Sequence, residues 1–489
     1  MSDVGPLAYL ALLALLAPFG AHRLRLLWLR MRRPARVESR AWDGPLPVVT
    51  VQLPVFNEAN VVERLIDAAC RLRYPADRLE IQLLDDSDDE TVAIAARRVR
   101  EWRARGIDIR HVRRGSREGF KAGALAHGVS LARGDFLLVL DADFVPSPEL
   151  IRELLPPFTD PGVGAVQAAW DHLSPDASWL TRAQALFLDA HFAIEHEARY
   201  RAGLFFNFNG SGGMWRKACV QAAGGWQSDT LTEDVDLSYR AQLAGWRFVY
   251  RDDVRVPAEL PANLRAVEIQ QSRWTQGGIQ SARKLLPRIW RAPVPAAIKF
   301  EATAHLVGHV VHPLTLTMAA ALAGAGWATA TGFGLPVAVH VAAVLLATVP
   351  FVLFYGSAGW IRGRRRLGRR IVEALLLGLG LGVPLTFAVA RACRGTRTPF
   401  VRTPKRGFQP VVAYRVRLSS GPALLRLALA ATLAGAVVNT ALVGSPAVLP
   451  FTALFAAGYA LTARESLRTA PAPAIPGQEG QRRPVDHPR

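Results

Sequence analysis

Apolar residues in the first half of the chain form short runs that alternate with amphipathic stretches. Val48–Val55 and Leu79–Leu84 are strand-like stretches, and Phe136–Leu140 is a continuous apolar run, which is the pattern of a strand buried on both faces of a sheet. Residues 58–73 and 120–132 carry apolar side chains at helical spacing. The alternation predicts an α/β domain of the nucleotide-binding class, with a mostly parallel sheet covered by helices on both faces.

Longer apolar stretches occupy the two ends of the chain and predict an α-helical transmembrane region. Pro6–Ala21 is followed, not preceded, by a run of arginines, so a membrane anchor is a better interpretation than a signal peptide. The later stretches are Ala304–Ala330, Leu335–Tyr355, Ile371–Ala390, Ala423–Val443 and Pro446–Leu461. All but the last reach the ~20 residues that cross a bilayer.

The basic segment 391–417 constrains the topology. If Ile371–Ala390 crossed the membrane fully, this segment would lie on the outer face, against the positive-inside rule. Gly378, Gly380 and Pro384 suit a bent, interfacial or re-entrant segment instead. We therefore expect residues 371–390 to be interfacial and the α/β domain to be cytoplasmic.

These patterns divide the chain into five predicted parts. They are an anchor with a basic juxtamembrane segment at 1–45, a cytoplasmic catalytic domain at 46–260, interfacial helices at 261–300, a transmembrane region at 301–463 that contains the basic loop 391–417, and a disordered tail at 464–489. The net charge of +19 suits an anionic membrane face, phosphorylated substrates or nucleic acid. Because the apolar stretches favour the lipid bilayer as a partner, we expect no nucleic-acid partner.

The run Phe136–Leu140 ends at Asp141-Ala142-Asp143, two carboxylates one residue apart. Ligands of open α/β sheets bind at the carboxyl ends of the strands. A hard divalent cation, completed by substrate phosphates, suits such a pair. Taken alone, the tripeptide is more typical of a solvated acidic turn, and the other motifs of the chain favour the cation site.

Three other predicted strand or helix ends carry polar residues. Asn57 and Glu58 follow the first strand and begin a helix, where they can contact a nucleotide or simply cap the helix. Asp85 and Asp86 follow the second strand, with the base or ribose of a nucleotide or an N-cap as the alternatives. Lys121, at a helix start, can neutralise a phosphate or lie on the surface.

Two clusters later in the chain complete the candidate site. Asn209 and Gly210 belong to a glycine-rich turn, and Glu233 and Asp234 begin a predicted helix in which Asp234 is a candidate general base. Gln270, Arg273 and Trp274 fall at i, i+3 and i+4 on one helix face. An arginine suits a pyrophosphate, and an aromatic plane suits the apolar face of a sugar.

Together these motifs resemble those of family 2 glycosyltransferases, in particular the membrane-embedded, processive, cellulose synthase-like and β-mannan synthase-like members. The matching motifs are Asp85-Asp86, Lys121-Ala122-Gly123, Asp141-Ala142-Asp143, Thr232-Glu233-Asp234 and Gln270-x-x-Arg273-Trp274. Phe400-Val401-Arg402-Thr403-Pro404-Lys405 resembles the gating loop of cellulose synthases, with Arg402 where valine is usual.

The resemblance implies a glycosyltransferase A-type fold and inverting transfer of a hexose from a nucleotide-sugar donor of the UDP-glucose or GDP-mannose type. Asp141 and Asp143 would hold Mg²⁺ or Mn²⁺, and Asp234 would be the base. Asp86 would contact the nucleoside, and Lys121, Thr403 and Lys405 the phosphates. Gln270, Arg273 and Trp274 would hold the pyrophosphate and the acceptor, which is a glycan or a lipid.

Three functions remain open on the sequence. A processive synthase of a β-linked polysaccharide is favoured by the gating-like loop and the tryptophan-bearing motif. An enzyme that adds a single sugar to a membrane lipid is the alternative, and a non-enzymatic transporter or scaffold is a third. In each case we expect an integral protein of a bacterial-type inner or plasma membrane, and the sequence predicts no particular partner subunit.

Overall fold

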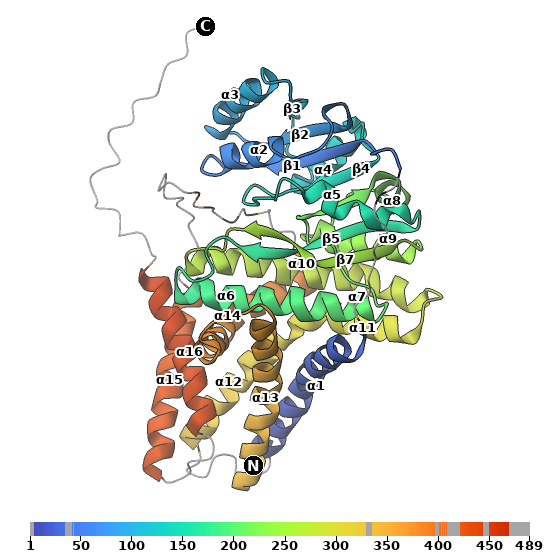
Figure 1. Cartoon of the computed structure of the whole chain (residues 1–489). Coiled ribbons are helices and arrows are strands. Elements are labelled where there is room, and N and C mark those ends of the chain that lie inside the picture. The colour runs from blue at the N-terminus through green and yellow to red at the C-terminus, as the bar shows by residue number, and fades with distance from the viewer. Residues whose placement is uncertain are drawn as a thin grey trace, which may run out of the picture.

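The computed structural model describes residues 4–34, 42, 44–328, 335–396, 401, 403, 405, 407, 421–443 and 449–468. A sheet-containing domain forms one end of the molecule, and a bundle of long helices forms the other (Figure 1). Several helices run crosswise between the two parts. The predicted combination of an α/β domain with long apolar helices is confirmed.

Seven strands form one sheet in the order β3-β2-β1-β4-β6-β5-β7. They are β1 (Val49–Val55), β2 (Leu79–Asp85), β3 (Ile109–Val112), β4 (Phe136–Val139), β5 (Val163–His172), β6 (Gly213–Arg216) and β7 (Arg247–Ala258). Only β6 runs antiparallel to its neighbours, so the sheet is mostly parallel as predicted.

The register of the central strands explains why the polar motifs meet. β1 pairs in parallel with β2 and β4, with Val55 opposite Asp85. These strands therefore end at the same edge, where the chain continues into Asp86 and Asp141. The antiparallel β6 adds the glycine-rich turn to this edge, since the Gly212 N–H donates to the Val139 carbonyl at 2.9 Å.

Short helices cover the sheet. They are α2 (Val62–Cys70), α3 (Thr91–Arg103), α4 (Phe120–Leu131), α5 (Leu150–Leu154), α8 (Lys217–Ala222) and α9 (Glu233–Leu243), with single 3₁₀ turns η1 (Ala76–Arg78) and η2 (Pro156–Thr159). The helix expected from residue 58 begins only at Val62. Asn57 has a φ of 54°, and this left-handed residue forces a turn before the helix begins.

A layer of helices lies between the sheet and the bundle. It contains α6 (Trp179–Ala190), which continues through the π-helical turn η3 (His191–His196) into α7 (Glu197–Arg201), together with α10 (Leu264–Arg291), α11 (Ala296–Leu306) and α14 (Leu367–Cys393). The interfacial helices expected at 261–300 correspond to α10 and the beginning of α11.

The bundle contains α1 (Val4–Arg32), α12 (Val311–Ala328), α13 (Val337–Ile361), α15 (Gly421–Val443) and α16 (Leu449–Arg468). Within the described residues, four helices are long and apolar enough to cross a membrane, or up to five if the bent pair α11 and α12 forms one span. That pair bends by 44° around the 3₁₀ turn η4 (Gly308–Val310), so the apolar stretch 304–330 is not one continuous helix. The tail expected from residue 464 was placed too early, because α16 continues to Arg468.

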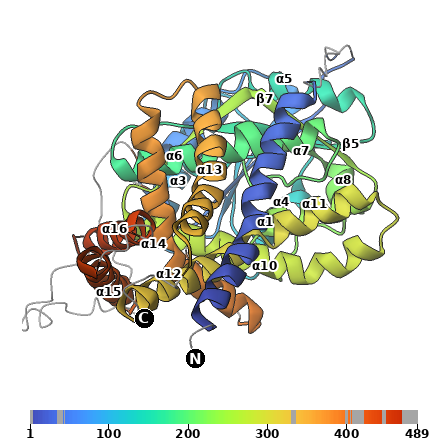
Figure 2. The same cartoon turned by 90° about the horizontal axis from the view of Figure 1, so that it is seen from below.

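The direction of α14 bears on the interfacial prediction. α14 is seen nearly end-on in Figure 1 and along its length in Figure 2, whereas α15 and α16 show the opposite. It therefore lies crosswise to these bundle helices, packed against α6, α10, α12 and α16. Its length and composition also allow it to span a membrane, so its interfacial position stays a prediction that the crosswise direction supports.

Candidate active site

The sheet edge opens into a cavity of about 160 Å³, here called the catalytic cavity. Nearly all the predicted site residues line it. They are Glu58, Asp86, Lys121, Asp141, Asp143, Asn209, Gly210, Glu233, Asp234, Gln270, Arg273, Trp274, Thr403 and Lys405. The topology thus brings together motifs that are more than 300 residues apart in the sequence.

Asn57 and Asp85 are not among the residues that line the catalytic cavity, so their contact with substrate stays a prediction that the structure does not support. The Asn57 amide instead donates to Asp88 at 2.8 Å. Asp85 is buried and accepts hydrogen bonds from the Ser87 N–H and the His111 ring. Asp85 therefore shapes the strand end from inside the fold, whereas the next residue, Asp86, faces the cavity.

Each carboxylate of the Asp-x-Asp motif is paired with a lysine. Lys121 Nζ lies 2.5 Å from Asp141 Oδ1, and Lys405 Nζ donates to Asp143 Oδ2 at 2.6 Å. Burial opposes the positive charge of Lys121, but Asp141 and Glu233 raise its pKa. The two carboxylates therefore each hold a lysine side chain beside them.

These two carboxylates fit a divalent cation that is completed by substrate. Mg²⁺ is commonly held by one or two protein carboxylates together with phosphate oxygens. Among the described residues, no group of three His, Cys, Asp or Glu side chains is arranged to hold a metal ion. A cation at Asp141 and Asp143 would therefore need further oxygen ligands from the donor, and the lysine pairs show that positive charge is favoured there.

Asp234 lies in the first turn of α9, and Asp234 Oδ1 accepts a hydrogen bond from the Val235 N–H at 2.9 Å. Burial and the like charge of Glu233 raise the pKa of Asp234 to about 7, although Lys121 acts in the opposite direction. A carboxylate with a pKa near neutrality is suited to accept a proton and to release it again. The position and electrostatics of Asp234 agree with the role of a general base.

Another part of the cavity wall, around Asp86, carries the planar guanidinium of Arg117 and the ring of Phe56. Arg114 forms a bidentate ion pair with Asp86, with contacts of 2.5 and 2.7 Å. Arg117 stacks over the Phe56 ring, 3.3 Å from its centroid, and burial lowers the pKa of Arg117. Arg117 and Phe56 were missed in the sequence, although the basic run from Arg113 to Arg117, just before Lys121, was a usable signal.

The Gln-x-x-Arg-Trp motif lies on α10 and faces the cavity as predicted. Burial lowers the pKa of Arg273, while Glu233 and Asp141 act against this effect. Trp170, another residue missed in the sequence, also lines this wall, and its indole N–H donates to the Ser211 carbonyl at 3.0 Å.

Part of the gating-like loop reaches the cavity. Thr403 is buried there, and Lys405 contacts Asp143 as described. The Lys405 carbonyl accepts a hydrogen bond from the Asn60 amide at 3.2 Å, which ties the loop to the turn after β1. Phe400, Arg402 and Pro404 of the predicted motif lie outside the described residues.

A second cavity of about 550 Å³ lies on the bundle side and is here called the membrane-side cavity. Helices α1, α12, α13, α14 and α16 line it with mostly apolar residues, and its wall also includes His191, Glu195 and Asn207. Six residues line both cavities: Trp170, Leu188, Asn209, Thr232, Asp234 and Trp274. The candidate base and the motif tryptophan therefore lie at the junction.

Comparison with known proteins agrees with this geometry. The sequence model of a family described as "Glycosyltransferase like family 2" matches residues 47–277, which contain the sheet and all of its motifs up to Trp274. Residues 47–277 thus form a domain of the glycosyltransferase family 2 type. The seven-stranded sheet and its carboxylates are thus those of a family 2 transferase domain, as the sequence motifs indicated.

Similar relatives of this chain come from plants. "Glucomannan 4-beta-mannosyltransferase 2" of Arabidopsis thaliana is 43% identical over 263 residues, which are 53% of this chain and 49% of the relative. "Probable glucomannan 4-beta-mannosyltransferase 7" of Oryza sativa subsp. japonica is 41% identical over 51% of this chain and 44% of the relative. The chain spans about half the length of the curated relatives it matches.

A solved structure shares the fold of the family 2 domain. The mannosyltransferase PcManGT from Pyrobaculum calidifontis, solved in complex with GDP-Man and Mn²⁺, aligns with a TM-score of 0.54 at 22% identity. The alignment covers 77% of this chain and 99% of that structure. This likeness confirms the glycosyltransferase A-like fold.

Proposed function

We propose that this protein is a membrane-bound, inverting mannosyltransferase that transfers mannose from GDP-mannose to the growing end of a β-linked glycan. The names of the plant relatives support mannose as the sugar and a glucomannan-type chain as the acceptor. The paired carboxylates and cations of the catalytic cavity support a charged nucleotide sugar as the donor.

The observation that carries the proposal is the junction of the two cavities at Asp234 and Trp274. A donor in the catalytic cavity would present its anomeric carbon to an acceptor that enters from the membrane side. Because Asn209, Thr232 and Trp170 also belong to both walls, the acceptor end would be held where the two substrates meet. The membrane-side cavity then offers a path for the product.

In this mechanism Asp234 takes the proton from the acceptor hydroxyl as that oxygen attacks the anomeric carbon. The bond to the nucleoside diphosphate breaks on the opposite face, so the configuration inverts. Trp274 forms the floor under the acceptor sugar, and Arg273 and Lys121 lie on the side of the leaving phosphates. Enclosure by Thr403 and Lys405 would exclude water from the reacting centre.

Asp141 and Asp143 would hold the divalent cation against the diphosphate. When bound, Mg²⁺ or Mn²⁺ neutralises the charge that develops on the leaving diphosphate. Lys121 and Lys405 would then contact phosphate oxygens instead of the two aspartates.

The central experiment supplies purified, membrane-reconstituted protein with a panel of radiolabelled nucleotide sugars, with and without Mn²⁺. The polymer and lipid fractions are analysed separately. We expect label from GDP-mannose in a ladder of β-linked oligosaccharides, and we expect Asp143→Ala or excess chelator to abolish it. Label only in a single-sugar glycolipid would replace the proposal with the lipid acceptor. No transfer from any donor would favour the transporter or scaffold.

We also propose that the transferase domain lies on the cytoplasmic side, with α14 at the membrane surface. The relatives named above are plant proteins, so they do not support the bacterial membrane expected from the sequence. A cysteine placed at Thr396, just after α14, tests the topology. Labelling of this cysteine by an impermeant reagent outside intact cells would contradict both the cytoplasmic side and the interfacial α14.

A further inference from the structure

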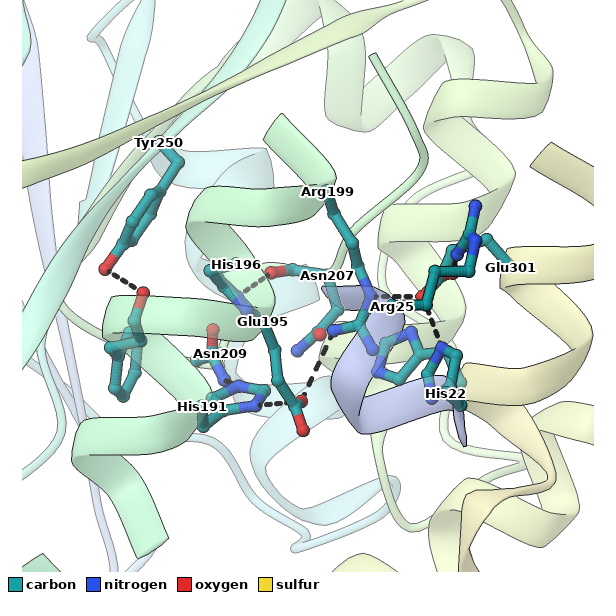
Figure 3. A network of polar contacts seen from close by, with 12 residues as sticks. His22, Arg25, His191, Glu195, His196, Arg199, Asn207, Asn209, Tyr250 and Glu301 are labelled. Atoms are coloured by element: carbon teal, nitrogen blue, oxygen red, sulfur yellow. Dashed lines mark hydrogen bonds and ion pairs between the residues drawn. The ribbon is translucent and has the colours of Figure 1, made fainter. Parts of the chain in front are cut away.

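A chain of partly buried polar contacts connects the N-terminal helix to the rim of the catalytic cavity (Figure 3). His22 and Arg25 of α1 both contact Glu301 of α11. Arg199 of α7 contacts Glu301 at 3.0 Å and Glu195 at 3.4 Å. Glu195 accepts from His191 Nδ1 at 3.0 Å, and His191 Nε2 lies 2.8 Å from the Asn209 amide. The chain therefore ends at a residue that lines both cavities.

The chain fixes the protonation pattern of His191. A carboxylate only accepts hydrogen bonds, and burial of Glu195 is outweighed by His191 and Arg199, which hold the Glu195 pKa well below its usual range. His191 Nδ1 therefore carries the proton that it donates to Glu195. Because an amide nitrogen only donates hydrogen bonds, His191 Nε2 is the acceptor of the bond from Asn209 Nδ2.

This pattern sets which end of the Asn209 amide is left for a ligand. The Asn209 N–H already donates to Gln167 Oε1 at 2.9 Å, which fixes the backbone. With Nδ2 on His191, the buried Asn209 Oδ1 has no hydrogen-bond donor among the described residues. Asn207 lines the membrane-side cavity and is only 5% exposed. Its Oδ1 also has no hydrogen-bond donor among the described residues. Buried acceptors without partners are uncommon and need an explanation.

Sugar hydroxyls are donors of the kind that these oxygens lack. Asn209 is one residue from Gly210, whose Cα lies close to Asp234, since a Cβ added at Gly210 would be 3.0 Å from Asp234 Oδ2. We propose that His191 is a positioning residue for the glycan acceptor, which turns the Asn209 amide so that Oδ1 accepts a hydrogen bond from an acceptor-sugar hydroxyl next to Asp234. The proposal rests on the glycan transfer proposed above and adds a determinant of acceptor recognition.

The location of the chain supports a fixed geometry. His191 begins the π-helical turn η3 between α6 and α7, and such turns are frequent at functional sites. Arg199 and Glu301 are almost completely buried, so Glu195 is held from behind by an ion pair that is screened from water. Helix α1, the predicted membrane anchor, thus also helps to fix the position of Asn209 at the rim of the catalytic cavity.

The test is a double-mutant cycle on the full-length, reconstituted enzyme, with GDP-mannose as donor and a soluble β-1,4-mannooligosaccharide as acceptor. The variants are His191→Phe, Asn209→Ala and the double variant. His191→Phe should raise the acceptor KM about 5- to 10-fold, the loss typical of one hydrogen bond, with the donor KM unchanged. The double variant should be no worse than Asn209→Ala alone, because both remove the same interaction.

Two further variants separate positioning from a structural role. His191→Gln keeps a side-chain oxygen that can accept from Asn209, so it should restore most of the acceptor affinity. His127→Phe, at an exposed histidine of α4, should behave as the wild type. If His191→Phe does not fold, His191→Met replaces it in the same cycle.

Two outcomes would overturn the positioning role. One is that the effects of His191→Phe and Asn209→Ala multiply in the double variant. The other is that His191→Phe shifts donor and acceptor KM equally or shifts neither. Failure of the proposed function is distinct from both, because wild type and His127→Phe would then transfer no mannose to the oligosaccharide.

Discussion

The catalytic cavity and the membrane-side cavity share a wall but differ in chemistry. The first is dominated by ion pairs, with Lys121 on Asp141, Lys405 on Asp143 and Arg114 on Asp86. The second is lined mostly by apolar side chains and also by histidines, asparagines, Arg23 and the paired Glu195 and Arg199. The first is therefore suited to a charged, exchangeable ligand, and the second, where Glu195 and Arg199 neutralise each other, to a neutral ligand rich in hydroxyl groups.

This difference suits the catalytic cavity to binding of the charged donor and the membrane-side cavity to passage of the proposed glycan. Phosphates and a cation are recognised by charged side chains. Interactions between such charges are strong at short range, and salt screens them little when they are buried. A glycan that must move along its path is better served by weak contacts with neutral groups and by smooth apolar walls. Changes on the charged side should alter turnover and donor affinity, and changes on the neutral side should alter acceptor affinity and product length.

The largest expected effect is at the shared wall. Asp234→Asn keeps the shape of the side chain but cannot take a proton, so kcat should fall ~10²–10⁴-fold with the donor KM little changed. Steady-state kinetics with labelled donor measure this split, and Asp77→Asn at an exposed aspartate is the matched control. A collapse of donor affinity with kcat preserved would make Asp234 a binding residue instead.

The next largest effect is expected for a change in the wall of the catalytic cavity. Lys405→Ala removes one charge-assisted contact to phosphate, worth ~1.5–3 kcal/mol, so the donor KM should rise by about one to two orders of magnitude. The acceptor KM should stay unchanged, and Lys299→Ala on α11, outside both cavities, is the control. If Lys405→Ala raised only the acceptor KM, the division between the two cavities would be wrong.

A smaller effect concerns pH. Because the pKa of Asp234 is raised to about 7, kcat/KM for the donor should increase with pH as Asp234 loses its proton, with an inflection near pH 7. Glu233→Gln removes the like charge that contributes to this rise, so the inflection should move to lower pH. A pH–rate profile of both enzymes measures the shift, and an unchanged inflection would show that another group controls the profile.

The smallest effect on rate is expected for a change in the wall of the membrane-side cavity. Gly378 of α14 lines the membrane-side cavity, and an added Cβ would meet only Phe187, at 3.7 Å. Gly378→Leu should shorten the products, as seen on a sizing gel, while the initial rate with a short acceptor stays close to that of the wild type. Gly368→Leu, at an exposed position of the same helix, should leave product length unchanged. Equal product lengths in both variants would argue against passage through this cavity.

Most of the fold could be predicted because parallel strands and their covering helices leave strong periodic signals. The strand ends then placed Asp86, Asp141 and Asp143 at one edge. Two predicted residues at this edge, Asp85 and Asn57, lie outside the cavity wall for local reasons. The pleat turns Asp85 inward to His111 while Asp86 faces the cavity, and Asn57 adopts a left-handed conformation that directs its amide to Asp88.

The polar contacts that connect His22 to Asn209 were missed in the sequence for a different reason. His191, Glu195 and Arg199 recur every four residues, a pattern that indicates a polar stripe along one face of a helix. Their partners Asn209, Glu301 and His22 come from distant segments. No spacing in the sequence relates these segments, because they meet only when the layer of helices packs between the sheet and the bundle.

The lysine partners of Asp141 and Asp143 also imply a thermodynamic linkage between ligands. Lys121 and Lys405 can leave these carboxylates at little cost only when another anion is offered to them, and the diphosphate of the donor is such an anion. Affinity for the cation should therefore be low without donor and rise when donor is present, and by reciprocity the cation should strengthen donor binding by the same factor. The enzyme would in this way respond to the concentration of the complete cation–nucleotide pair, and little to either component alone.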